Sequence, residues 1–242
     1  MKRIAALLFL SWSFTVFIAA MILVFPFILV LSVLLNGKRA QDSIFFFLKI
    51  WAALFSVLCF FPVRSRGINK TDRAYIYVCN HNSYLDAIAV VTAIKGSFKP
   101  LGKIEMVRVP IFGLIYKKVV VLIDRKSKES RARSVEELKA DLAKGQSILI
   151  FPEGTMNRSD EALADFYDGA FRIAIETQTD IVPMVILNAR KLFPRANPLA
   201  IKPGQITCVF AEPVKVNGMV PEDLEKLKSG VRETMEKMIR NS

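Results

Sequence analysis

Two long apolar runs occupy the first 61 residues of the chain. No charged residue occurs from position 4 to position 37, and the second run, at positions 43–61, carries only Lys49. The first run is longer than the apolar core of a signal peptide, which has about 7 to 15 residues, and it exceeds the roughly 20 residues that span a bilayer. As one helix, residues 4–35 would be about 48 Å long, so the helix must tilt, bend at Pro26 or lie partly in the interface. The two runs predict a helical hairpin that anchors the chain in a membrane.

Positively charged residues flank both ends of the first run. Lys2 and Arg3 precede it, and Lys38 and Arg39 follow it. A hairpin that spans the membrane twice and one that dips into a single leaflet both return the chain to its starting side, and the basic flanks favour the cytoplasmic face. We therefore expect the rest of the chain on the cytoplasmic face of the cell inner membrane. A buried hairpin in a soluble protein is the alternative interpretation.

Three polar residues in and just before the second run recur every seven positions: Asp42, Lys49 and Ser56. On a helix they share one side. We predict that this side faces lipid headgroups or the rest of the protein, while the phenylalanines of the run lie in lipid.

After residue 72 the hydrophobic pattern alternates between strands and helices. Strands are predicted at 74–79, 98–102, 119–124, 147–151, 181–187 and 205–210, and helices at 87–94, 110–116, 127–144, 166–177 and 221–240. This alternation indicates an α/β domain with a mixed sheet flanked by helices. Residues 64–72 are predicted to be a polar connection. The organisation we expect is a membrane-anchoring helical hairpin at 1–63 followed by a catalytic domain at 64–242.

Composition narrows the range of functions. Hydrophobic residues make up 52% of the chain and its net charge is +12 at pH 7, which is typical of proteins that meet anionic membranes or anionic substrates. Nucleic acid is not an expected partner, because the sequence has no zinc-finger spacing, basic helix or RNA-binding signature. The three cysteines form no CxxC motif, which indicates a reducing compartment, and Cys79 is predicted to be a small buried hydrophobe rather than a nucleophile. With one histidine and no cysteine cluster, we expect no metal site.

The seven residues from Asn80 to Asp86 carry the clearest candidate chemistry. His81 is the only histidine in the chain. It follows a predicted buried strand, and the carboxyl ends of such strands open onto the crevice of α/β folds. On a continuous helix His81 and Asp86 would be about 140° apart, so they can meet only if the chain bends, and Asn82 and Ser83 favour a turn or a helix N-cap. The alternative is structural, since Ser83-x-x-Asp86 also resembles a capping box.

Three further motifs stand at the ends of predicted strands or within one. Each is weak alone, because an Asp-Arg pair after a strand is usually a local ion pair and Pro-Glu-Gly-Thr is usually a turn. Their joint occurrence in this order, after an apolar hairpin and a His-x4-Asp motif, is much more specific than any one of them. They are Asp124-Arg125, Pro152-Glu153-Gly154-Thr155 and Val182-Pro183-Met184.

With these motifs, residues 64–216 resemble the glycerolipid acyltransferase family, specifically the 1-acyl-sn-glycerol-3-phosphate acyltransferases. The first family motif, Asn-His-x4-Asp, matches Asn80, His81 and Asp86; the second matches Ile123, Asp124 and Arg125, with Lys103 and Glu105 upstream; the third matches Phe151 to Thr155; and the fourth matches Val182, Pro183 and Met184. The resemblance implies transfer of an acyl group from an acyl-CoA or acyl carrier protein thioester to the sn-2 hydroxyl of 1-acyl-sn-glycerol-3-phosphate, giving phosphatidic acid. The thioester is a co-substrate, and no cofactor is expected.

For this reaction His81 would act as the general base and Asp86 would orient it and stabilise its protonated form. The substrate's own hydroxyl would take the place of a serine nucleophile. Backbone N–H groups near Gly154 are candidate donors to the oxyanion, and the acyl chain would need an apolar groove shared by the hairpin and the helix after Asp86. Candidate substrate-binding residues are Lys103, Arg125, Glu153, Gly154, Thr155 and Arg158, and candidate acyl-pocket residues are Val182 and Pro183.

One position departs from the family pattern. The arginine that follows the third motif, which is thought to hold the acceptor's phosphate, is replaced by Met156, and the next arginine is Arg158. Arg158 could serve if the loop bulges by two residues. If it does not, another lyso-lipid becomes the expected acceptor. The remaining alternatives are a membrane-bound lipid hydrolase that uses water, and a non-enzymatic membrane anchor.

Overall fold

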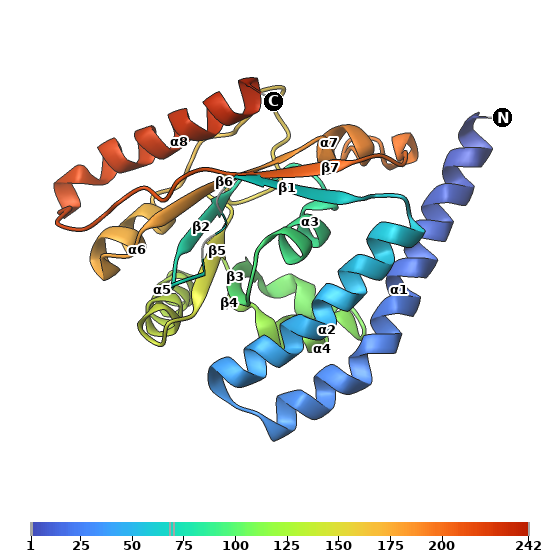
Figure 1. Ribbon diagram of the computed structural model, residues 1–242, viewed down its shortest axis with the longest axis horizontal. Coiled ribbons are helices and arrows are strands. Elements are labelled where there is room, and N and C mark those ends of the chain that lie inside the picture. Colours follow the sequence, from blue (N-terminus) through green and yellow to red (C-terminus); the bar gives the residue numbers. More distant parts are fainter. Residues whose placement is uncertain (1, 68, 70, 242) are drawn as a thin grey trace.

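Seven strands form one sheet at the centre of the structure, a computed structural model that describes residues 2–67, 69 and 71–241 (Figure 1). The strands are β1 (Val63–Gly67), β2 (Ile76–Cys79), β3 (Phe98–Lys103), β4 (Val121–Ile123), β5 (Ser147–Ile150), β6 (Ile181–Leu187) and β7 (Ile206–Phe210). Their order is β1-β7-β6-β2-β5-β3-β4. Within the described residues β6 and β7 pair antiparallel and the other neighbours pair parallel. The prediction of a mixed α/β sheet is confirmed.

Helices cover both faces of this sheet (Figure 1). The α-helices are α1 (Lys2–Leu34), α2 (Gly37–Leu58), α3 (Asp86–Ala93), α4 (Phe112–Val119), α5 (Lys128–Ala143), α6 (Gly169–Thr177), α7 (Ala189–Leu192) and α8 (Leu224–Arg240), and the 3₁₀ helices are η1 (Ile104–Arg108), η2 (Pro198–Ala200) and η3 (Pro221–Asp223). Buried residues of α5, α6 and α8 pack on one face, whereas α1, α2 and α3 pack on the other. The result is a three-layered arrangement with the sheet in the middle.

The central strand β2 shows why both faces need covering. Ile76 and Val78 belong to the core beside α5, α6 and α8, and Tyr77 and Cys79 belong to the core beside α2 and α3. All four side chains are buried. A strand without a polar face is stable only between two apolar layers, which is the usual environment of parallel strands.

The predicted strands and the long helices are confirmed, with shifts of one to three residues at most ends. The main correction is β1, which lies in a segment predicted to be a polar connection. Arg64, Ser65 and Arg66 are exposed, so the segment lacks the apolar alternation that identifies a strand. Its backbone nevertheless pairs with β7 at the edge of the sheet, and an edge strand needs no apolar face to be held there. The short elements α7 and η2 also lack a periodic signal and were not predicted.

The first two helices form the predicted hairpin. One stripe of α1 is buried against its surroundings, including Val16, Val24 and Ile28, whereas large apolar side chains such as Phe14 and Leu23 are exposed on its other sides. A helix that is apolar all round is typical of a lipid environment or a deep core. By length and composition both helices could cross a membrane. At 33 residues α1 is about 50 Å long, and it continues through Pro26.

The hairpin docks on the sheet through one side of α2. The side-chain amide nitrogen Nε2 of Gln41 donates to the carbonyl oxygen of Phe98 at 3.0 Å, and the Ser97 hydroxyl group donates a hydrogen bond to Asp42. The rings of Phe45 and Phe98 meet edge to face, with their centroids 4.7 Å apart. These contacts bind the start of α2 to the start of β3.

The polar side predicted for α2 therefore faces the protein. Asp42 bonds Ser97, and Ser56 is buried. The prediction that the phenylalanines lie in lipid is wrong for Phe45 and Phe55, which are buried. Phe45 is one turn from Asp42, and Phe55 is next to Ser56. The side of α2 that packs against the rest of the protein is wide enough to include both rings.

We predict that Phe45→Ala lowers the free energy of unfolding by about 3–5 kcal/mol, the usual cost of removing a buried phenylalanine ring. Phe45 is 3% exposed and its neighbour Phe46 is 62% exposed, so Phe46→Ala is the matched control and is expected to have little effect. Both are measured by thermal unfolding of the purified protein in the same detergent. Equal effects of the two substitutions would show that α2 does not dock as described.

Candidate active site

The loop after β2 is tied to the neighbouring strand by Asn80. Its side-chain amide donates to the carbonyl oxygen of Ile186 at 3.1 Å and accepts the backbone N–H of Ile186 at 2.7 Å. Asn80 is 2% exposed, so both of its polar ends satisfy backbone groups that would otherwise be buried without partners. This pair of bonds holds the carboxyl end of β2 against β6, and His81 follows directly.

The chain bends between His81 and Asp86, and their side chains are in contact. The imidazole Nδ1 lies 2.8 Å from Asp86 Oδ2, and the same oxygen accepts the backbone N–H groups of Asn82 at 2.7 Å and Ser83 at 2.9 Å. The structural alternative is also present in part, because the bond from the Ser83 N–H to Asp86 Oδ2 is one of the two bonds of a capping box. One carboxylate thus shapes the turn before α3 and orients the imidazole.

This geometry determines which ring nitrogen is available for chemistry. Asp86 Oδ2 already accepts two backbone N–H groups, so the ring nitrogen facing it is the one that carries the proton. The other nitrogen, Nε2, then has a free lone pair, and no described residue forms a hydrogen bond with it. The His81 side chain is 24% exposed and that of Asp86 is fully buried. The arrangement can accept a proton from a bound hydroxyl group.

The opposite wall of the site comes from the segment after β5. The ring of Phe151 stacks on the imidazole of His81, with centroids 4.3 Å apart and planes inclined by 26°. The backbone N–H of Asn157 donates to the His81 carbonyl oxygen at 2.7 Å. Neither residue was among the predicted site residues. The position of Phe151 directly before Pro-Glu-Gly was a usable signal, whereas nothing in the local pattern points to Asn157.

Glu153 was predicted to bind substrate, and in the structure its carboxylate is bonded to backbone groups. Oε1 accepts the backbone N–H of His81 at 2.7 Å and Oε2 accepts that of Ala164 at 2.8 Å. The residue is 3% exposed. Burial raises the pKa of its carboxyl group, although the two backbone N–H donors oppose the shift. Both oxygens are thus bound to backbone N–H groups, and Glu153 holds the loop that carries His81.

The backbone N–H groups near Gly154 do not match their predicted role as oxyanion donors. The N–H of Gly154 donates to the Phe151 carbonyl oxygen at 3.0 Å, and that of Thr155 donates to the Glu153 carbonyl oxygen at 2.8 Å. Gly154 has φ +67, and a Cβ there would lie 2.8 Å from the ring of Tyr167. The glycine is required for the turn and for this close approach. Thr155 is exposed at the rim.

Two predicted cations lie at the ends of adjacent strands. In the β3–β4 pair Lys103 is opposite Ile123, so Lys103 and Arg125 leave the sheet at the same edge. One guanidinium nitrogen of Arg125 lies 3.7 Å from the position a Cβ on Gly154 would take. Lys103 and Arg125 are both exposed. They form a cationic side of the site, next to the loop that supports His81.

Arg158 and Arg195 occupy different positions relative to Met156. Arg158 is exposed and forms no hydrogen bond or ion pair with any other described residue. Arg195 donates from Nη1 to the Met156 carbonyl oxygen at 3.4 Å. Its chain neighbour Pro194 forms a β-bridge with Ser83. Sequence reasoning missed Arg195 because it lies in an irregular segment without a motif, and only the folded chain brings it to the loop next to His81.

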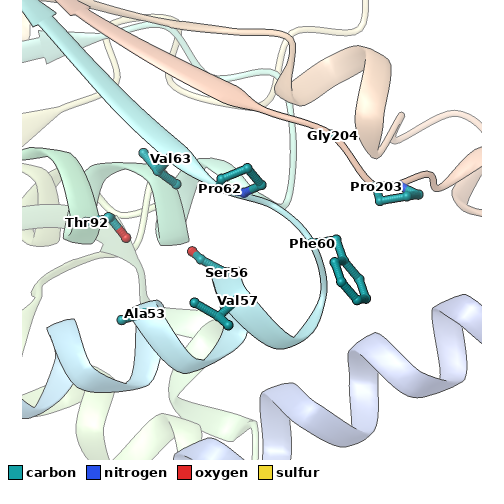
Figure 2. Close-up of a pocket in the computed structure, with 9 residues that line it drawn as sticks. All are labelled: Ala53, Ser56, Val57, Phe60, Pro62, Val63, Thr92, Pro203 and Gly204. Atoms are coloured by element: carbon teal, nitrogen blue, oxygen red, sulfur yellow. The ribbon is translucent and has the colours of Figure 1, made fainter.

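The predicted acyl-pocket residues are placed in the interior of the sheet. Val182 and Pro183 lie within β6 opposite Tyr77 and Val78, and both are buried. A groove of about 820 Å³ lies elsewhere, between the hairpin and α3 (Figure 2). It is lined by Ala53, Ser56, Val57, Phe60, Pro62, Val63, Thr92, Pro203 and Gly204. The structure thus has an apolar groove between the two elements expected to share one, and Val182 and Pro183 do not line it.

The groove lies at the end of the sheet where His81 also lies, which is the carboxyl end of β2 and β6. Arg64 and Leu187 both pair with Thr207 of β7, so β1 begins beside the end of β6, to which Asn80 is bonded. Three strand spacings separate β1 from β2 in the sheet order, which is about 14 Å. Figure 2 shows Ser56 and Thr92 directed towards the groove from α2 and α3. The Ser56 hydroxyl group has no hydrogen-bond partner among the residues that the structure describes.

Cys79 is a small buried side chain, as predicted from the sequence. Cys79 is fully buried, and burial raises the pKa of its thiol well above the ordinary value, with the carboxylates of Asp86 and Glu153 acting in the same direction. A thiol that cannot ionise is a poor nucleophile.

Comparisons with known proteins agree with this fold. A sequence model of the family described as Acyltransferase matches residues 62–187, more than half of the chain. The chain is 28% identical over 221 residues to a 1-acyl-sn-glycerol-3-phosphate acyltransferase of Chlamydomonas reinhardtii, covering 90% of this chain and 65% of that protein. It is 32% identical over 169 residues to one of Cocos nucifera, covering 67% and 53% respectively. The chain therefore spans about half to two thirds of the length of these relatives.

A solved structure supports the architecture over the whole chain. The 1-acyl-sn-glycerophosphate (LPA) acyltransferase PlsC from Thermotoga maritima superposes with a TM-score of 0.83 at 22% sequence identity, covering 100% of this chain and 97% of that one. At this identity the likeness establishes the fold. Together with the match over residues 62–187, it leads to one conclusion: the chain belongs to the acyltransferase family.

Proposed function

We propose that this protein transfers a fatty acyl group from an acyl thioester to the sn-2 hydroxyl of 1-acyl-sn-glycerol-3-phosphate, forming phosphatidic acid for phospholipid synthesis. The observation that carries the proposal is the 2.8 Å hydrogen bond between His81 Nδ1 and Asp86 Oδ2, which leaves Nε2 free to act as a base. The names of the relatives from Chlamydomonas reinhardtii and Cocos nucifera support the choice of acceptor.

The chemical step is direct transfer. Nε2 of His81 takes the proton of the acceptor hydroxyl group as its oxygen attacks the thioester carbonyl carbon. The C–S bond then breaks, and the proton on the imidazolium goes to the departing thiolate. Asp86 stabilises the imidazolium between these steps. No covalent acyl-enzyme is required, because the substrate hydroxyl is the nucleophile and Cys79, the nearest thiol in sequence, is buried.

The acceptor's phosphate would be held by cations at the edge of the sheet. Arg125 and Lys103 supply one side, and Arg195 reaches the loop at Met156 from the other. A guanidinium group can fork onto two phosphate oxygens, which fixes the orientation as well as the charge. Arg195 thus offers a guanidinium group next to Met156, where the sequence departs from its family. Arg158 and Thr155 would contribute at the exposed rim.

The acyl chain would occupy the groove between α2 and α3, which lies at the His81 edge of the sheet and is lined mainly by apolar side chains. A long acyl chain spans the separation between β1 and β2. The donor would be acyl-CoA or acyl carrier protein, since a net charge of +12 favours anionic carriers. The hairpin would hold the site at the membrane surface, on the cytoplasmic face, where a lyso-lipid can enter laterally.

The test of the reaction is acyl transfer by the detergent-purified protein to lysophosphatidic acid, with product identified by mass spectrometry. His81→Ala should lower turnover by about 10²–10⁴-fold, the usual contribution of a general base. Asp86→Asn should also lower it strongly, because an amide does not hold the required tautomer. Asp223→Asn is the matched control, since Asp223 accepts the N–H of Val220 at the start of η3. Free fatty acid released without acceptor, at the rate of transfer, would indicate a hydrolase instead.

Arg195→Ala should raise KM for lysophosphatidic acid by about 10- to 100-fold, because it removes one charge-assisted hydrogen bond of about 1.5–3 kcal/mol. Arg158→Ala should change it less than about threefold, and Arg195→Lys should restore part of the loss, since lysine keeps the charge without the fork. The measurement is steady-state kinetics with varied acceptor. The opposite order of effects would assign the phosphate to Arg158. If the wild type were active only with lyso-lipids that lack a terminal phosphate, lysophosphatidic acid would not be the acceptor.

Ala53→Trp should fill part of the groove and shift the preferred donor to shorter acyl chains, without changing KM for the acceptor. Phe46→Trp is the matched control on the same helix, because Phe46 is exposed and does not line the groove. Competition between donors of different chain length, with products separated by mass, measures the shift. An unchanged chain-length profile would place the acyl chain elsewhere.

A further inference from the structure

Exposed apolar side chains outside the hairpin gather in one segment, residues 104–114. Beyond residue 61, eight large apolar side chains are exposed in the described part of the chain. Four of them are in this segment: Ile104 at 38%, Met106 at 39%, Val109 at 41% and Leu114 at 54%. The other four are scattered over the rest of the domain. A concentration of this kind marks an interaction surface, whereas single exposed apolar residues need no explanation.

The segment lies beside the hairpin. It comprises η1 and the start of α4, and α4 packs against both η1 and α1. The ring of Phe112 lies 6.4 Å from that of Phe17 in α1. Figure 1 shows α4 next to the hairpin, while α5, α6 and α8 lie across the sheet. The exposed apolar side chains of residues 104–114 are therefore carried by elements that pack beside α1.

The same segment is bordered by cations. Lys103, Arg108, Lys117 and Lys118 are all exposed, and Glu105 is the only acidic residue from position 103 to position 119. Interleaved basic and apolar side chains are typical of elements that lie in the headgroup region of an anionic bilayer. An acidic protein partner would match the charges, but it would not account for exposed apolar side chains beside the hairpin.

We propose that η1 and α4 form a second membrane-contacting element, with Ile104, Met106, Val109 and Leu114 in the interface and Lys117 and Lys118 on anionic headgroups. The proposal rests on the membrane location proposed above for the hairpin. Its consequence is a defined orientation of the domain. Lys103 directly precedes the segment and leaves the sheet at the same end as Arg125, so the cationic side of the site faces the headgroups from which an anionic lyso-lipid would enter.

The test uses single cysteines that carry an environment-sensitive fluorophore, in full-length protein reconstituted into vesicles with and without lipids that quench at the headgroup level. Leu114→Cys and Met106→Cys are the test positions, and Phe14→Cys in α1 is the positive control. Val220→Cys is the matched negative control, because Val220 at 50% is exposed like Leu114 but precedes η3 and α8. The native cysteines are buried, and labelled wild type supplies the background.

We expect quenching at positions 106 and 114 to be several-fold greater than at position 220, and greater in vesicles that contain phosphatidylglycerol than in phosphatidylcholine alone. Lys117→Glu with Lys118→Glu should remove the dependence on anionic lipid, and Lys226→Glu on α8 should not. Quenching at position 14 together with water-like emission at 106 and 114 would overturn the inference and leave the hairpin in place. No quenching at position 14 would instead reject the membrane location itself. Protection of position 114 only by added acyl carrier protein would assign the surface to that protein.

Discussion

The carboxylate of Asp86 holds together the part of the protein on which everything else depends. One oxygen accepts the imidazole Nδ1–H and two backbone N–H groups, all in a fully buried position. A buried carboxylate needs hydrogen-bond donors in place of water. Oδ1 has no donor among the described residues, so all three donors are on Oδ2. The chain between β2 and α3 must therefore bend around this oxygen, and the bend directs the imidazole to the edge of the sheet. The same carboxylate oxygen therefore stabilises the local fold and orients the candidate base.

A second buried carboxylate, that of Glu153, also accepts backbone N–H groups and holds the His81 loop from the other side. Glu153 accepts the N–H of His81 with one oxygen and the N–H of Ala164 with the other, so it joins the loop after β2 to the segment after β5. Asn80 makes the corresponding link to β6. Three polar side chains, each almost completely buried, thus fix three loops relative to one imidazole. Hydrogen bonds of this kind keep the candidate base in one orientation.

The apolar part of the molecule follows a different constraint. The side of α2 that carries Asp42 and Phe45 packs against the start of β3. In contrast, α1 has exposed apolar side chains over most of its length. The sheet therefore has a fixed position relative to the surface that lipid would cover. The same docking places the groove between α2 and α3 at the sheet edge where His81 lies, and it places α4 beside α1. Anchoring and access to the site depend on one set of hairpin contacts.

The turn residues Asn82 and Ser83 allowed His81 to meet Asp86, and the structure shows that they do. The order of strands and helices along the chain and the hairpin were determined by local sequence, because hydrophobic periodicity acts over a few residues. β1 was not, since an edge strand is held by backbone pairing with a partner more than a hundred residues away. The roles of Glu153 and Arg195 also depended on the tertiary structure. Whether a carboxylate faces substrate or backbone, and whether a guanidinium group reaches a loop 39 residues earlier, depends on which distant N–H and C=O groups the fold brings within 3.5 Å.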